Sequence, residues 1–309
     1  MRRKIGTTIL TPWLAASRGW RSVPYLYAGA TAVFTALWCA FAANTPQEWR
    51  GPPHMNEPEI ALLEAGVKGQ AKKSGRGIPW YLFKVGAANA IILSHIAANA
   101  TEYTLTQWAP TFFIEQHGVS PAQLGQFLAL PQTAAFAATF VTAALEDLAL
   151  RSGMALLTVR KVAGLGGSIL HAICLLAFGL GAWQCPSVAP VPRALVVTYN
   201  RCTLCAWAGR TPQQSMWAYC GVTATQCVYG SGHIPNYMEV GAADVGVLKA
   251  IGNTVANAPG VVIPALGVAL RQRFNGSWIP LLALVGAFQV AAGTVYACLA
   301  SVESAERPR

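Results

Sequence analysis

Four polar side chains follow one another at helical spacing inside an apolar segment: His95, Asn99, Glu102 and Thr106. Intervals of 4, 3 and 4 residues place them on one face of a helix, within an arc of roughly 60°. Glu102 is the only carboxylate deep within any apolar segment, and a charge at mid-bilayer costs roughly 2.5 to 3.5 kcal/mol. We therefore favour a substrate or proton path. The alternative is a protonated Glu102 that hydrogen-bonds to a neighbouring helix.

A second polar stripe has intervals of 3, 4 and 3 residues and comprises Gln226, Tyr229, His233 and Asn236. It could line the same cavity as the first. Bonds between neighbouring helices are an equally good explanation, because Pro235 disrupts this helix and membrane helices often pair through such side chains. His171 stands alone in its segment and is expected to be a hydrogen-bonded packing residue.

The polar stripes lie in apolar segments that are long enough to cross a bilayer. Only 34 of 309 residues are charged, 11% of the chain, against about 25% in globular proteins. Blocks of about 20 apolar residues cross a bilayer, and in lipid their Ala-, Leu- and Gly-rich composition favours helices over barrel strands. The sequence therefore predicts an all-helical, multi-pass integral membrane protein with one short segment and seven full spans: 5–14, 23–43, 85–108, 124–145, 162–183, 217–235, 245–270 and 279–302.

The net charge of +10 is explained by topology and by contact with anionic lipid. No basic run interleaves with exposed aromatic residues, so the lipid bilayer is an expected partner and nucleic acid is not. If residues 44–77 are cytoplasmic, 13 Lys and Arg fall inside and 7 fall outside. This bias predicts that orientation.

The segment from Val245 to Leu270 is rich in small residues that permit close helix contact. We expect Gly246, Ala250 and Gly252 to pack against a neighbour and Pro259-Gly260 to permit a bend. Asn253 and Asn257 are expected to bond across helices.

No motif for a cofactor, a metal or an enzyme is present. The pair Cys202 and Cys205 has redox or metal spacing, but neither a second pair nor nearby histidines follow. We therefore predict no metal, no cofactor and no enzymatic activity. A membrane-embedded acyl or phosphoryl transferase that uses His95 and Glu102 is a distant alternative.

Several strings, taken in order, resemble the anion:cation symporter family of the major facilitator superfamily. This group contains sodium/phosphate cotransporters, sialin, vesicular glutamate transporters and plant plastid anion transporters. The resemblance covers nearly the whole chain except residues 184–215. The strings are Gly19-Trp20-Arg21-Ser22-Val23, Trp108-Ala109-Pro110-Thr111-Phe112-Phe113, Thr158-Val159-Arg160-Lys161, Gly252-Asn253-Thr254 and Pro259-Gly260.

The resemblance implies a domain arrangement as well as a fold. Residues 1–43 would be a remnant of the first six-helix bundle, corresponding to family helices five and six. Residues 44–79 would be the cytoplasmic linker between the bundles, with a short helix near Glu57 to Ala65. Residues 80–309 would be the second bundle, interrupted by an irregular insertion at 184–215. The chain would then lack the first four family helices and, on its own, would not transport.

The resemblance also implies a cytoplasmic gate, because Asp147, Arg151, Arg160 and Lys161 match the charged loop between family helices eight and nine. Two departures stand nearby: Glu146 replaces a usual alanine, and Asn236-Tyr237-Met238-Glu239 carries Glu for Asp. Lys249 and Ala250 replace an apolar residue and a glycine.

The function predicted from the residues and the resemblance is secondary active transport of an anion, inorganic phosphate or an organic carboxylate, coupled to Na⁺ or H⁺. The rival is a helical membrane scaffold or partner protein that transports nothing. A second chain that supplies the first bundle is a further expected partner.

Overall fold

The computed structural model describes residues 2–43, 45, 48–49, 56–71, 80–180, 211–241 and 244–303. Every regular element in these ranges is a helix, which confirms the predicted fold class. The helices are α1 (Arg2–Arg18), α2 (Ser22–Phe41), α3 (Glu57–Ala71), η2 (Trp80–Lys84), α4 (Gly86–His117), α5 (Pro121–Arg151), α6 (Leu156–Lys161), η3 (Val162–Gly166), α7 (Gly167–Leu180), α10 (Pro212–Gly241), α11 (Val245–Ala256), α12 (Pro259–Arg273) and α13 (Ile279–Leu299).

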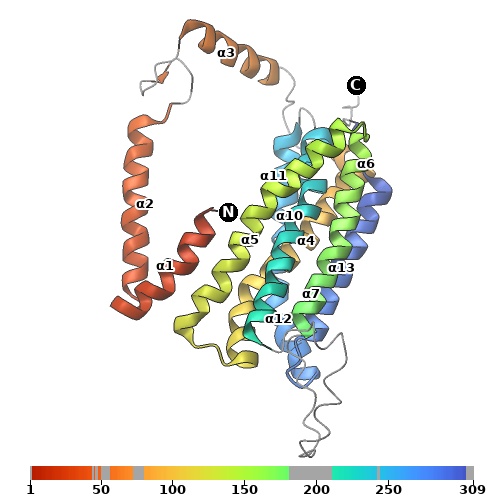
Figure 1. Ribbon diagram of the computed structural model, residues 1–309. Coiled ribbons are helices and arrows are strands. Elements are labelled where there is room, and N and C mark those ends of the chain that lie inside the picture. Colours follow the sequence, from red (N-terminus) through yellow and green to blue (C-terminus); the bar gives the residue numbers. More distant parts are fainter. Residues whose placement is uncertain are drawn as a thin grey trace, which may run out of the picture.

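The helices from α4 to α13 pack side by side as one bundle (Figure 1). Within it, α10 packs against α4, α5 and α7, and α13 packs against α4 and α7. Aromatic residues fill one end of the core around Phe112, Phe178 and Trp278. Leu82, Tyr237 and Tyr296 belong to a second buried cluster.

The first two helices lie outside this bundle. The helix α2 has no buried residue along its 20 residues, and in Figure 1 it stands apart from the bundle. The helix α1 contacts both α5 and α2, and Thr11 bonds to Tyr27 through their hydroxyls at 2.9 Å. An apolar helix with no buried side chain suits a lipid environment.

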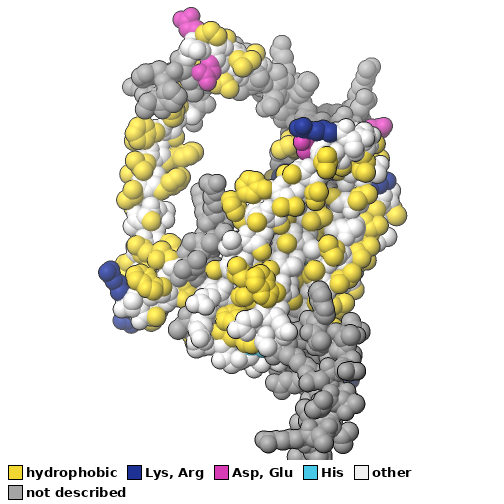
Figure 2. Space-filling model, in the orientation of Figure 1, with side chains coloured by type: hydrophobic (Ala, Val, Ile, Leu, Met, Phe, Trp, Pro, Cys, Tyr) yellow, Lys and Arg dark blue, Asp and Glu magenta, His cyan; other side chains and the backbone are white. Residues whose placement is uncertain are grey.

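Five helical segments in the described residues are long and apolar enough to cross a membrane, by length and composition: 22–41, 123–151, 156–180, 245–273 and 279–299. The remaining long helices, α4 and α10, have 32 and 30 residues but carry the polar stripes. In Figure 2, apolar side chains cover the middle of the molecule and Lys and Arg gather at its ends. This distribution is that of a multi-pass membrane protein.

One difference from the predicted elements lies at the start of α10. The helix α10 begins at Pro212, inside the predicted insertion, because Thr211 and Gln214 form a reciprocal cap with side chain to backbone bonds of 3.2 and 3.1 Å. The predicted insertion therefore ends earlier than residue 215. Its residues 184–210, with Cys202 and Cys205, lie outside the described residues.

The segment predicted as one span from Val245 to Leu270, with a bend permitted at Pro259-Gly260, divides into two helices. The helix α11 ends at Ala256, and Pro259 opens α12. Proline has no N–H to bond with the preceding turn, so the helical hydrogen-bond ladder is interrupted there. The division into 1–43, 44–79 and 80–309 stays a prediction.

Candidate functional site

Glu102 is the point at which the two polar stripes meet. Gln226 Nε2 of α10 donates a hydrogen bond to Glu102 Oε2 at 3.2 Å. The Thr106 hydroxyl, one turn further along α4, donates to Glu102 Oε1 at 3.5 Å. Glu102 and Gln226 are half-buried and Thr106 is exposed, so this carboxylate lies at the edge of the bundle and not in its centre.

The histidines of the two stripes lie two turns from Glu102. His95 Nδ1 lies 3.2 Å from the Tyr237 hydroxyl, and the rings of His95 and His233 are 6.1 Å apart. His233 is 2% exposed, and its Nδ1 lies 3.1 Å from the Tyr229 carbonyl oxygen. The stripes of α4 and α10 therefore form one polar strip, which we define as His95, Asn99, Glu102, Thr106, Gln226 and His233.

Asn99 connects this strip to the break between α11 and α12. Its Nδ2 donates to the carbonyl of Ala256, the last residue of α11, at 2.8 Å. A helix end within a membrane leaves carbonyls that need a donor, and Asn99 supplies one. The Tyr103 hydroxyl donates to Asn257 Oδ1 across the same junction. Polar side chains of α4 thus hold the broken helix in place.

The glycines of α11 and α12 that were predicted to permit close contact or a bend differ in how near their neighbours lie. A β-carbon at Gly252 would collide with the Tyr237 hydroxyl, and one at Gly260 would lie 3.0 Å from the Tyr103 ring. Gly246 does not pack against a neighbour as predicted, since a β-carbon there would meet no heavy atom within 4 Å. Its side of α11 is exposed, and so is Asn253, whose backbone carbonyl accepts from Asn257 Nδ2 at 2.6 Å.

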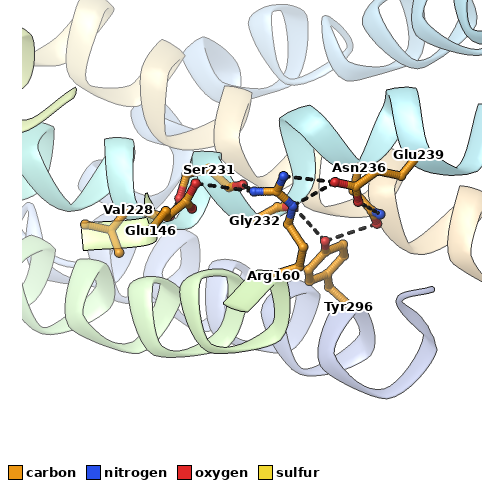
Figure 3. Close-up of polar contacts among 8 residues, drawn as sticks. All are labelled: Glu146, Arg160, Val228, Ser231, Gly232, Asn236, Glu239 and Tyr296. Carbon is orange, nitrogen blue, oxygen red and sulfur yellow. Dashed lines mark hydrogen bonds and ion pairs between the residues drawn. The ribbon is translucent and has the colours of Figure 1, made fainter. Parts of the chain in front are cut away.

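Near the C-terminal end of α10, Arg160 of α6 lies between two carboxylates (Figure 3). Its Nη2 donates to Glu239 Oε1 at 2.9 Å, and its Nη1 donates to Glu146 Oε2 at 3.3 Å and to the Ser231 carbonyl at 3.1 Å. The three charged side chains are 11 to 20% exposed. This arrangement ties α6 to both α5 and α10.

Asn236 belongs to this charged group and makes no described bond to the polar strip. Its Nδ2 donates to Glu239 Oε2 at 2.6 Å and to the Ser301 carbonyl at 2.8 Å. Tyr296 of α13 donates to Asn236 Oδ1 at 3.1 Å. The spacing of Gln226 and His233 continues to Asn236, which made Asn236 a candidate for the path. Tyr296 was missed, since it carries no periodic signal.

The other predicted gate residues make no described bond to the Arg160 group. Arg151 pairs with Asp147 of the same helix at 2.8 Å, and both side chains are more than half exposed, at 76% and 57%. Lys161 follows Arg160 on α6 and is half-buried. Of the four predicted residues, only Arg160 lies in a closely packed charged group.

His171 is a packing residue, as predicted. It is fully buried in α7, and its Nδ1 lies 3.0 Å from Thr225 Oγ1 and 3.1 Å from the Val222 carbonyl. Its bonds therefore join α7 to α10.

An all-helical bundle with an apolar surface and a polar strip defines an integral membrane protein of several spans. Residues 5–219 match the family model of the Major Facilitator Superfamily, and the chain belongs to this superfamily.

Similar proteins place the chain near the anion transporters of that superfamily. It is 26% identical over 274 residues to the voltage-gated purine nucleotide uniporter of Homo sapiens, and the match covers 86% of this chain and 52% of that protein. It is 23% identical over 294 residues to sialin of Ovis aries, covering 93% and 53%. It is 24% identical over 269 residues to the chloroplastic ascorbate transporter of Arabidopsis thaliana, covering 87% and 43%. These relatives confirm the resemblance to the anion:cation symporter group. The chain spans about half their length.

Proposed function

We propose that this chain forms one wall of the substrate path in a secondary active transporter for a small anion, inorganic phosphate or an organic carboxylate, coupled to Na⁺ or H⁺. The observation that carries the proposal is the 3.2 Å bond from Gln226 to Glu102. It joins polar residues of two helices near the middle of each, where a polar side chain needs protein or water beside it.

The superfamily and the relatives support this proposal. Two relatives are named for a purine nucleotide and for ascorbate, and both compounds are anions at neutral pH. Transporters of this superfamily bind substrate near the bilayer midplane, between two helical bundles. Glu102 and Gln226 lie at the corresponding depth of α4 and α10.

We propose that the first six-helix bundle, in one polypeptide with this one or in another chain, covers the polar strip. Alternating access rocks one bundle against the other, and the Arg160 group at the bundle end suits a cytoplasmic gate that opens and closes in this motion. Thr106 on the strip is exposed in the structure and so is free to face such a bundle.

Uptake into liposomes tests the proposal. The purified chain is reconstituted alone and together with a separately expressed first bundle of a related transporter. Uptake of labelled phosphate and labelled succinate is then measured under a Na⁺ or a H⁺ gradient. We expect saturable uptake only when both bundles are present. A chain that inserts correctly yet supports uptake in neither preparation would favour the non-transporting scaffold.

In the same preparation, Glu102→Gln tests whether Glu102 couples substrate movement to proton movement. Glutamine keeps a group that can bond with Gln226 and Thr106 but cannot take up and release a proton. We expect the variant to lose uptake driven by a pH gradient and to retain exchange of internal for external substrate. Unchanged pH dependence in Glu102→Gln would reduce Glu102 to a structural hydrogen bond.

A further inference from the structure

Lys249 of α11 is a cation without a carboxylate partner in the described part of the chain. Its ammonium lies over the Tyr237 ring, 4.2 Å from the centroid. Two arginines of the bundle, Arg160 and Arg271, each bind a carboxylate at 2.9 and 2.5 Å. Asp244, at the start of the same helix, accepts instead from the Tyr81 hydroxyl at 2.9 Å. A half-buried charge in apolar surroundings is costly without a counter-charge, so Lys249 provides positive charge that a bound anion would neutralise.

His233 supplies an independent observation, a buried acceptor with no donor. Its Nδ1 lies 3.1 Å from the Tyr229 carbonyl oxygen, which can only accept, so Nδ1 carries the hydrogen. In the neutral ring Nε2 is then a lone-pair acceptor. Nε2 is buried, and no donor in the described residues reaches it. A buried acceptor left without a hydrogen bond costs about 1 to 3 kcal/mol of stability. An N–H or O–H donor would satisfy it.

Tyr237 brings these two groups together. Its ring lies beneath Lys249, and its hydroxyl lies 3.2 Å from His95 Nδ1. The rings of His95 and His233 are 6.1 Å apart. Lys249 and His95 are half-buried, so a solute on the polar strip can approach them. Three helices thus contribute to one site, two turns of α4 or about 10 Å from Glu102.

We infer that Lys249, His95 and His233 form a binding site for an oxyanion that carries a hydroxyl group, such as hydrogen phosphate or a 2-hydroxycarboxylate. The ammonium of Lys249 neutralises the anion, and the hydroxyl of the ligand donates to His233 Nε2. This inference rests on the proposed function, because it names the substrate class of the same polar strip.

Matched pairs of anions test the inference by calorimetric titration of the purified full chain. Phosphate and glycolate carry a hydroxyl at neutral pH, whereas sulfate and acetate do not. We expect phosphate to bind about tenfold more tightly than sulfate, and glycolate about tenfold more tightly than acetate, because one satisfied buried acceptor corresponds to that ratio. Lys249→Met should weaken the binding of phosphate about tenfold or more, and Lys249→Arg should restore it. Lys84→Met, at an exposed lysine of η2, is the matched control and should change nothing.

His233→Met removes the acceptor while the residue stays apolar and of similar size. We expect it to bring the affinities for phosphate and sulfate within about threefold of each other. Elution volume and melting temperature show whether each variant is folded. Equal affinities within both anion pairs, or wild-type affinity in folded Lys249→Met, would overturn the inference and leave anion transport standing. If the wild-type chain binds none of the four anions, the inference fails, whereas the proposed function is decided by uptake with both bundles present.

Discussion

Arg160 is the residue on which the charged end of the bundle depends. Its side chain is 11% exposed, and its guanidinium contacts two carboxylates, from Glu146 and Glu239. Removing one partner from a buried ion pair leaves the other charge without compensation, at a cost of about 3 to 5 kcal/mol. Arg160 therefore stabilises this end chiefly because its absence would leave two carboxylates close together.

We expect Arg160→Met to lower the stability of the chain by about 3 kcal/mol. Arg151→Met is the matched control, since its pair with Asp147 is exposed, and a surface pair contributes about 1 kcal/mol or less. The melting temperature of each variant in detergent measures the difference. Equal melting temperatures would show that the Arg160 group does not stabilise this end of the bundle.

Among the helices, η3 and α7 approach α10 so closely that only glycine fits. A β-carbon at Gly167 would lie 2.6 Å from the backbone nitrogen of Tyr229, and one at Gly232 would lie 2.8 Å from the backbone nitrogen of Gly164. Small residues of this kind allow membrane helices to pack backbone to backbone. The same approach brings Arg160, just before η3, within reach of Glu239 on α10.

Gly166 and Gly167 are neighbours in the sequence, but only Gly167 lies against another helix. Gly167→Ala should destabilise the chain by about 1 to 3 kcal/mol, because the rigid Tyr229 backbone cannot move aside. Gly166→Ala meets no atom within 4 Å and should be neutral or should stabilise the helix by up to about 1 kcal/mol. Thermal unfolding of both variants measures the two effects. A loss of stability in Gly166→Ala equal to that in Gly167→Ala would contradict this packing.

The helices were predictable from sequence, and their partners were not. Bilayer thickness fixes the length of an apolar block, and Pro259 marks the break after Ala256. By contrast, Arg160 and Glu239 are 79 residues apart, and their pairing depends on which faces of α6 and α10 meet. Asn236 shares the spacing of Gln226, but its end of α10 meets α13, so Asn236 bonds to Glu239 and Ser301.

At the scale of the whole molecule, the charge bias predicts the orientation in the membrane. The turn at Ser152 should be cytoplasmic and the turn at Ser120 should face the other side. Both serines are exposed. With the 8 native cysteines replaced, Ser120→Cys should react with an impermeant reagent in intact cells, and Ser152→Cys only after permeabilisation. The opposite pattern would reverse the orientation.

The central claim is that the strip on α4 and α10 lines a water-filled path for an anion. Thr106→Cys tests it most directly, with Ile169→Cys as the control. Both positions are exposed, and each lies about three turns before the last described residue of its helix. In the cysteine-free chain reconstituted in liposomes together with the first bundle, an impermeant thiol reagent should label Thr106→Cys, phosphate should slow that labelling, and Ile169→Cys should stay unlabelled. Labelling of Thr106→Cys as slow as that of Ile169→Cys, with no effect of phosphate, would show that the strip faces lipid or protein and would contradict the claim.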